Sequence, residues 1–244
     1  MRRRREICLG AVLLCLASSP SDAEKASSDP HRVSRSAFAD RVRTIALLPA
    51  RVPLSVDRRV AVREEVHRAL SAILKRKGYR VVDPATVETI EREHARPLGQ
   101  VFDPITGKAD PQRWDAVWKA TKETLSSRHG VDALLCPELL QGELKAYTES
   151  LWKGTKYAAG EPLVWNGRAL KMAPDRVEGV YLSILIEDRA AAELYDALTP
   201  LAWTAIYRER ARQARPSNEA IRAEQINSAV TSALDPLVDA RPTP

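Results

Sequence analysis

The chain has 244 residues, of which 29% are charged, and its formal net charge is +6. The first 23 residues contribute four arginines and two acidic residues, so the remainder carries only +4. This is an ordinary, mildly basic surface that gives nucleic-acid binding little support, and no nucleic-acid partner is expected.

The N-terminal segment has the layout of a secretory signal peptide. The four arginines Arg2–Arg5 precede an apolar stretch from Ile7 to Ala17, and a run of small residues ends at Ala23. The apolar stretch is shorter than the roughly 20 residues that a membrane-spanning helix requires. We therefore expect residues 1–23 to be a signal peptide, export to the bacterial periplasm and cleavage after Ala23. An uncleaved anchor helix is the alternative.

The cysteines bear on anchoring as well as on chemistry. A bacterial lipid anchor requires a cysteine directly after a small residue, and neither Cys8, after Ile7, nor Cys15, after Leu14, meets this requirement. We therefore expect a secreted protein without a lipid anchor. Signal cleavage would leave Cys136 as the only cysteine, which excludes a disulfide within the mature chain.

Composition divides the remaining chain into three parts. Residues 24–40 are polar and rich in serine, which predicts a flexible linker. Residues 41–237 should form a single α/β domain, because a chain of this length can bury a core without disulfides. Residues 238–244 are expected to be a disordered tail.

The domain opens with a strand–helix–strand–helix pattern. Residues 42–49 are a short apolar run, typical of a strand buried on both faces. Apolar residues recur every three or four places over 56–77, which predicts an amphipathic helix ending at Gly78. A second strand is expected over 79–83 and a second helix over 84–94. This order predicts a βαβ unit with parallel strands.

The later segments predict a change to antiparallel strands. Residues 111–129 should form a third amphipathic helix, followed by a strand over 131–136 that Pro137 is expected to bulge or end. Residues 177–188 and 201–208 alternate between the two faces of a sheet, which predicts an antiparallel pair joined by the segment between them.

The chain is expected to end in a helix that begins near Ser217. Its buried face should include Ala223, Ile226 and Val230. The fold class expected is therefore α/β, a mixed sheet with a parallel βαβ start and an antiparallel meander, with helices packed on it.

Three short motifs carry a family resemblance. VRTIALLP (42–49), GYRVVD (78–83) and HGVDALL (129–135) follow one another in the expected strand and helix order. This pattern resembles the periplasmic domains of the curli-assembly lipoprotein and related bacterial lipoproteins, and the amino-terminal domain fold of TolB. The likeness extends over about residues 40–140, and the strands at 180–203 resemble the pair that follows in those domains.

The resemblance implies a non-catalytic envelope protein that binds other proteins, often at the outer membrane. It brings no catalytic residues. The chain departs from the family in lacking a lipid-anchor cysteine and in a longer insert, FDPITGKAD (102–110).

The chain shows no motif for catalysis or metal binding. It has no serine between paired glycines, no glycine-rich run ending in Gly-Lys-Ser/Thr and no HExxH motif. The four histidines, His31, His67, His94 and His129, do not pair at metal-ligand spacing. We therefore expect no cofactor, no metal and no enzymatic activity.

Cys136 has two interpretations. A catalytic cysteine needs some exposure and a nearby cation or helix N-terminus that lowers its pKa. Cys136 instead ends the apolar run 131–135, and about 20 Å of extended chain separates it from His129. We interpret it as a buried packing residue.

The best candidates for binding lie in the aromatic segment 148–176. Interface energy concentrates in Trp, Tyr and Arg, which makes Trp152, Tyr157, Trp165 and Arg168 candidate partner-binding residues. The alternative is that the tryptophans pack against the sheet of their own domain.

The function expected is that of an exported periplasmic envelope protein acting in protein–protein interaction or assembly. One alternative is a small-ligand-binding protein with a cleft between the meander and the helices. Another is a hydrolase with an unrecognised site. The sequence leaves open the identity of the envelope partner and the oligomeric state.

Overall fold

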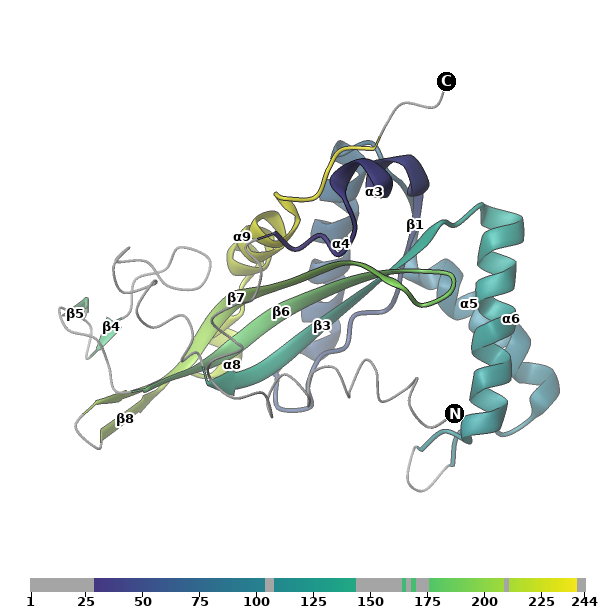
Figure 1. Ribbon diagram of the computed structural model, residues 1–244. Helices are drawn as coiled ribbons and strands as arrows, with labels where there is room; N and C mark the ends of the chain where they lie inside the picture. Colours follow the sequence, from purple (N-terminus) through teal and green to yellow (C-terminus); the bar gives the residue numbers. More distant parts are fainter. Residues whose placement is uncertain are drawn as a thin grey trace.

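A six-stranded sheet forms the centre of the fold (Figure 1). The computed structural model describes residues 29–103, 108–143, 164–165, 168–169, 176–208 and 211–240. The strand order is β2-β1-β3-β6-β7-β8, and β4 and β5 form a separate two-stranded sheet. The elements in chain order are α3 (Arg35–Arg41), β1 (Thr44–Leu47), α4 (Arg59–Arg76), β2 (Arg80–Val82), α5 (Pro84–Ala95), the 3₁₀ turn η1 (Arg96–Leu98), α6 (Pro111–His129), β3 (Ala133–Glu143), β4 (Val164–Trp165), β5 (Arg168–Ala169), β6 (Arg176–Asp188), β7 (Glu193–Arg208), β8 (Ala211–Ala214), α8 (Ser217–Ala220) and α9 (Ala223–Leu234).

The sheet changes from parallel to antiparallel at β3. Ile45 of β1 lies beside Val81 of β2 and Ala133 of β3 in parallel register. β3 pairs with β6, β6 with β7 and β7 with β8, all in antiparallel orientation. The predicted mixed α/β sheet with a parallel start is therefore confirmed.

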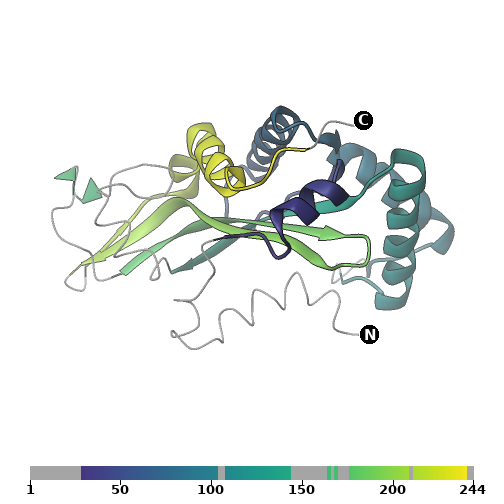
Figure 2. The ribbon, with the colours of Figure 1, turned by 45° about the horizontal axis from the view of Figure 1, so that its top comes forward.

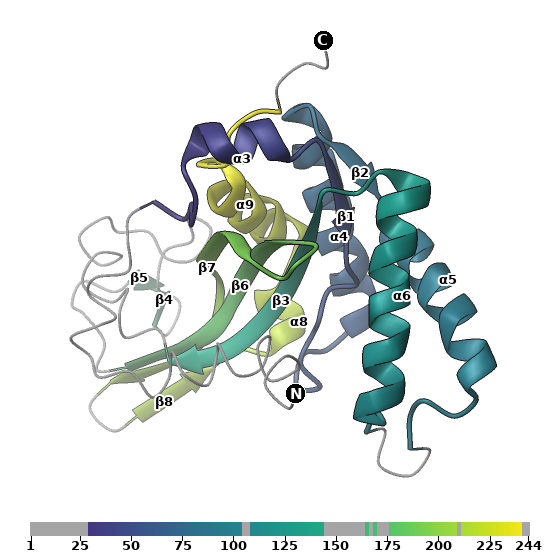
Figure 3. The same ribbon diagram turned by 45° about the vertical axis from the view of Figure 1, so that its right-hand side comes forward.

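Helices cover both faces of the parallel strands, and alternate residues of β1 belong to different cores. Ile45 and Leu47 are fully buried in the larger core, which α4 and α9 complete. Ala46 points to the other face, where Val87 of α5 and Leu125 of α6 form a second core with it. Figures 1 and 2 show α4 and α9 on one side of the long strands, and Figure 3 shows α5 and α6 beside the parallel strands.

Local sequence signals explain where the helices begin and end. α4 buries apolar residues every three or four places, as predicted, and Gly78 follows it with a φ of 86° that only glycine adopts easily. The Asp110 carboxylate caps α6 by accepting hydrogen bonds from the N–H groups of Gln112 (3.0 Å) and Arg113 (3.1 Å). Gly130, with a φ of 62°, ends that helix.

The segment before β1 belongs to the folded domain. Arg35–Arg41 form α3, and Phe38 within it is fully buried. The Phe38 ring makes edge-on contacts with His31, at 5.4 Å between ring centroids, and with Tyr79, at 6.4 Å. The predicted flexible linker over 24–40 is therefore wrong in its C-terminal part, because one large aromatic side chain docks the short helix.

The residues after α9 also pack onto the domain. The Tyr79 hydroxyl donates a hydrogen bond to the Val238 carbonyl, and the Ala240 N–H donates one to the Lys77 carbonyl at 2.8 Å. Val238 and Ala240 are partly buried against the larger core. The predicted disordered tail over 238–244 is therefore wrong in its first three residues, and its last four lie outside the described residues.

β3 runs without interruption through Pro137. Pro137 lies opposite Ile184 of β6 in unbroken register, so the expected bulge or strand end is wrong. The Pro137 carbonyl accepts a hydrogen bond from the Arg51 N–H at 3.0 Å, on the side where β1 has ended at Leu47. Because the nitrogen and the carbonyl of a strand residue point to the same side, the missing N–H falls beyond the end of β1.

Cys136 occupies the strand position that its packing interpretation requires. It lies in β3 opposite Leu185, but its side chain is half-buried rather than buried. Alternation along β3 turns Leu135 into the larger core and Cys136 to the other face, which it shares with Leu134. Complete burial was therefore a wrong expectation, and the strand assignment is confirmed.

β7 is longer than predicted. It begins at Glu193, so most of the segment expected to join two strands is itself strand, and the turn is confined to 189–192. Ala191 in this turn has a φ of 62°. The β6–β7 register shifts beside Pro200, and such a bulge is where a strand tolerates proline.

The C-terminal helix is divided into α8 and α9. Ile226 and Val230 are buried as predicted, whereas Ala223, the first residue of α9, is exposed. The short strand β8 precedes these helices and is absent from the sequence prediction. None of the helices in the described ranges has the length and apolar character that a membrane span requires.

Candidate interaction surface

The aromatic segment attaches to the sheet at the end that also carries β8. The chain leaves the sheet at Glu143, the last residue of β3, and re-enters it at Arg176, the first residue of β6. Arg176 pairs with Tyr207, next to the turn that joins β7 to β8. We call the residues Glu143, 176–179, 203–208 and 211–214 the distal end, and Figure 1 shows the long strands running toward it beyond α4 and α9.

The structure describes two of the four predicted binding residues. Trp165 ends β4 and Arg168 begins β5, and these two residues pair directly with each other. Trp152 and Tyr157 lie outside the described residues. The structure therefore brings two of the four together on one small hairpin, and their role in binding a partner stays a prediction.

A hydrogen-bonded arginine and tyrosine lie on the β7–β8 hairpin. The Arg212 Nε–H donates to the Tyr207 hydroxyl at 3.0 Å, and that hydroxyl donates to Glu178 Oε1 at 2.9 Å. The guanidinium carbon of Arg212 lies 5.8 Å from the centroid of the Tyr207 ring, within cation–π range. Arg212 is nevertheless exposed, so these contacts orient its guanidinium without covering it.

A second arginine–aromatic pair joins β8 to the helices. The guanidinium carbon of Arg215 lies 4.5 Å from the ring centroid of Trp203, whose side chain is only 3% exposed. Arg215 also donates from Nη2 to the Ala220 carbonyl, which ends α8, at 3.2 Å. Arg215 therefore holds the hairpin to the domain, whereas Arg212 is the guanidinium that faces solvent.

Sequence reasoning missed this hairpin. The strand prediction over 201–208 stops before β8, so the segment 207–215 (YRERARQAR) was not expected to hold a further strand. β8 has the sequence Ala-Arg-Gln-Ala, which does not alternate between apolar and polar residues, so the sequence carries no clear signal for this strand.

Two carboxyl groups have raised pKa values. Burial raises the pKa of Glu187, with Asp188 and Glu193 adding to the rise and Lys122 opposing it. Burial likewise raises the pKa of Glu138. The two side chains share the face of the sheet that carries Leu134, but they lie four ladder positions apart, on the order of 13 Å. That exceeds the spacing at which paired carboxyl groups act on one glycosidic bond.

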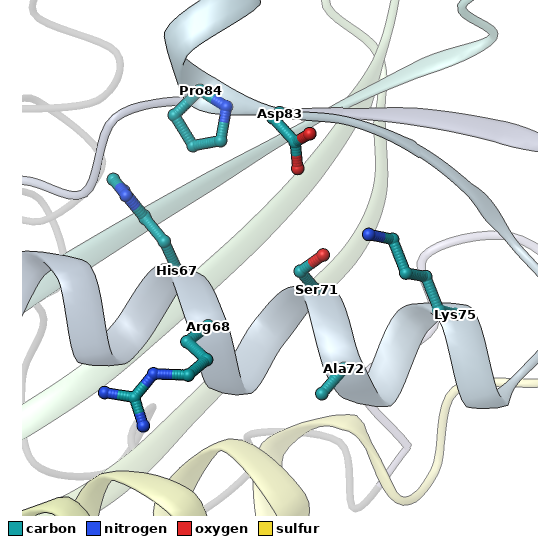
Figure 4. A pocket seen from close by; sticks show the side chains of 7 residues that line it. All are labelled: His67, Arg68, Ser71, Ala72, Lys75, Asp83 and Pro84. Atoms are coloured by element: carbon teal, nitrogen blue, oxygen red, sulfur yellow. The ribbon is translucent and has the colours of Figure 1, made fainter.

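A shallow groove of about 370 Å³ lies between α4 and the start of α5 (Figure 4). His67, Ser71 and Lys75 line it at four-residue spacing along α4, opposite Asp83 and Pro84. This differs from the predicted position of a ligand cleft, between the meander and the helices. Arg68 and Ala72 complete the lining.

His67 in this groove is a structural residue. Its Nε2 accepts a hydrogen bond from the Ala50 N–H at 2.7 Å. Burial, assisted by the nearby Arg63, lowers the pKa of His67 to about 4, so the ring is neutral near pH 7. Lys75 and Asp83 form no ion pair within the part of the chain that the structure describes.

No group of three or more His, Cys, Asp or Glu side chains in the described ranges is arranged to hold a metal ion. The histidines occupy separate places. His94, for example, shares a hydrogen bond of 2.8 Å with Thr124. His31 instead lies beside the rings of Phe38 and Tyr195.

Comparison with known proteins yields only a weak likeness. No protein-family model matches the chain, and no curated protein matches it. Two solved structures that match are the PelC dodecamer from Paraburkholderia phytofirmans, 11% identical with a TM-score of 0.32, and a single-residue variant of it, 12% identical with a TM-score of 0.33. In both, the match covers 88% of this chain and 96% of the PelC chain. A likeness at this level assigns neither a family nor a function.

Proposed function

We propose that this chain is an exported, non-catalytic protein of the bacterial cell envelope that acts by binding another protein through its distal end. The observation that supports this most is that two candidate binding segments attach to the same end of the sheet. The aromatic segment and the β7–β8 hairpin are separated in sequence, yet both join the sheet at the pairing of Arg176 with Tyr207. Trp, Tyr and Arg are the residue types that dominate interface energetics.

The envelope location depends on the sequence of the N-terminal segment. Arginines followed by a short apolar stretch and a small-residue run are the signal-peptide pattern. The resemblance of the strand motifs to the curli-assembly lipoprotein and TolB domains supports the same location. It also supports association with other envelope proteins and with the outer membrane.

Site-specific photo-crosslinking in cells tests this function. A photoreactive amino acid would replace Tyr157 or Arg212, with exposed Glu123 of α6 as the matched control position. We expect the first two positions to capture the same envelope protein and the control to capture none. Mass spectrometry of the mature protein should find its N-terminus at Glu24.

Each contrary result contradicts a different part of the proposal. A retained Met1 would refute cleavage and favour a membrane anchor. Equal capture at all three positions would refute the distal end as the binding surface. If no position captures a protein, binding of another protein is contradicted, and the α4 groove becomes the leading site.

The groove supports a second candidate function, the binding of a small ligand. Its volume of about 370 Å³ lies at the lower end of the range of ligand pockets. Lys75 and Asp83 offer opposite charges to a small polar molecule. Native mass spectrometry of the purified protein would test this candidate, and Lys75→Gln should abolish any bound mass that it reveals.

A further inference from the structure

We propose that β8 binds an acidic, extended segment of the partner protein by strand addition to the open edge of the sheet. This inference rests on the proposed function, because it describes the chemistry of the partner at the distal end. Three features carry it: the backbone groups of β8, the orientation of Arg212 and the charge of the hairpin.

β8 leaves backbone hydrogen-bonding groups at the edge of the sheet. It is the last strand in the sheet order and pairs only with β7 among the described strands. The Arg215 N–H donates to the Thr204 carbonyl at 2.7 Å, which fixes which residues bond toward β7. Because this direction alternates, the N–H and C=O groups of Arg212 and Ala214 point away from β7.

The exposed residues leave this edge accessible. Ala211, Arg212 and Ala214 are exposed, and the two alanines are too small to shield the backbone. An unpaired edge of this kind is a template for a partner strand, and main-chain hydrogen bonds then supply much of the affinity. An extended segment could therefore add to β8 without rearrangement of the sheet.

Arg212 is prepared to bind a carboxylate. Its Nε–H is used by the Tyr207 hydroxyl and its plane is held near the Tyr207 ring, so the side chain is already oriented. Its terminal nitrogens make no hydrogen bond to any residue that the structure describes. The two terminal nitrogens of this guanidinium lie in one plane, and their spacing matches the two oxygens of a carboxylate.

The charge of the hairpin selects an acidic partner over a second copy of this chain. Residues 207–215 contain four arginines and one glutamate. Pairing two β8 strands would bring their arginines together, and like charges at facing positions destabilise a sheet. The other edge strand of the sheet, β2, begins with Arg80 and contains no acidic residue. Pairing of β8 with β2 of a second copy would therefore bring no carboxylate to Arg212.

A binding measurement with the full mature chain and a defined probe tests strand addition. The probe is a fluorescent, end-blocked peptide of alternating glutamate and valine, and the control peptide has lysine in place of glutamate. At low salt, fluorescence anisotropy should show binding of the acidic peptide alone. We expect Arg212→Glu to weaken binding by about tenfold or more, since it replaces a charge-assisted contact with repulsion.

Ala214 distinguishes strand addition from charge attraction. Ala214→Pro removes an N–H that β7 does not use, whereas Ala214→Ser keeps it and serves as the matched control. We expect the proline variant to bind about fivefold or more weakly than the serine variant, with similar thermal unfolding. Equal binding by the two variants would overturn strand addition, and so would absence of peptide binding. Stronger binding to phosphatidylglycerol vesicles than to the acidic peptide would also overturn it.

If Ala214→Pro unfolds, Arg212→Gln replaces it, and unchanged affinity of that variant overturns the inference. The outcome is separable from that of the proposed function. Capture of an envelope protein at position 212 without peptide binding leaves the function standing and refutes strand addition. Peptide binding without a captured envelope protein refutes the proposed function and leaves the edge chemistry intact.

Discussion

The helix-covered half of the sheet and the distal end put similar residues to different uses. In the helix-covered half, formed by β2, β1 and the start of β3 with α3 to α6 and α9, Ile45 and Leu47 are sealed between helix layers. Tyr195 of β7 packs into the same core, where its hydroxyl donates to the Ala233 carbonyl. At the distal end, the Tyr207 hydroxyl instead orients the exposed Arg212.

This difference separates stability from recognition. A tyrosine inside the core satisfies a carbonyl of the last helical turn, which has no partner within its helix. A tyrosine at the distal end arranges a charge that faces solvent. We therefore expect substitutions in the first region to change the free energy of unfolding, and substitutions in the second to change partner binding at nearly constant stability.

The largest expected effect is that of Phe38→Ala. Phe38 is fully buried and attaches α3 to the core, so its truncation should lower the free energy of unfolding by about 3–5 kcal/mol. Chemical denaturation measures this loss. The control is Leu54→Ala, at a side chain that is 84% exposed, which should stay within about 0.5 kcal/mol of the natural chain. Equal stability of the Phe38 variant would show that α3 is not docked.

A matched pair of smaller changes sharpens the comparison. Tyr195→Phe should cost about 1–3 kcal/mol, because it leaves the buried Ala233 carbonyl without this donor. Tyr207→Phe should cost less than about 0.5 kcal/mol, because water can replace a bond at a half-exposed site, but it should weaken capture of the acidic peptide. Similar costs of unfolding for the two variants would contradict the separation.

A smaller effect than that of Phe38→Ala is the acid sensitivity that His67 contributes. Its pKa is lowered to about 4 in the folded chain, so the unfolded chain binds more protons between about pH 6.5 and 4. Stability is therefore lost as the pH falls through this window. His67→Gln keeps an acceptor for the Ala50 N–H, and it should reduce the loss by about 1–2 kcal/mol, allowing for partial exposure of the ring.

Glu187→Gln of β6 tests a pKa shift in the opposite direction. The folded pKa of Glu187 is raised by burial, so its contribution to stability is lost as the pH rises above its ordinary value. Denaturation curves at several pH values should show this variant losing less stability than the natural chain as the pH rises. His67→Gln should reduce the stability lost as the pH falls, whereas Glu187→Gln should reduce the stability lost as the pH rises. If both variants changed stability in the same pH range, the assigned burial of one of the two groups would be contradicted.

Much of the helix-covered half could be predicted from the sequence. Its helices have clear apolar periodicity, and Pro84, Asp110 and Gly130 mark their ends with local chemistry. These signals require no long-range information. The parallel order of β1 and β2 then follows from the short βαβ connection.

The missed features depend on partners distant in sequence. Pro137 is tolerated because β1 has already ended beside it, and Pro200 because β7 shifts register there. Phe38 signals a helix only once His31 and Tyr79 are known to surround it. The open edge of β8 likewise could not be predicted from its sequence, because it depends on the direction of each hydrogen bond to β7.

Residues near both ends of the described chain contact segments that are distant in sequence, and this has a consequence for how the domain folds. Arg32 bonds to Asp196 across a separation of 164 residues, and Tyr79 bonds to Val238 across 159. Contacts between such distant residues slow folding, because a long loop must close before they form. During synthesis the β1–α4–β2 unit is made long before residues 235–240, which pack against it. This unit is thus expected to stay incompletely packed until residue 240 has been made.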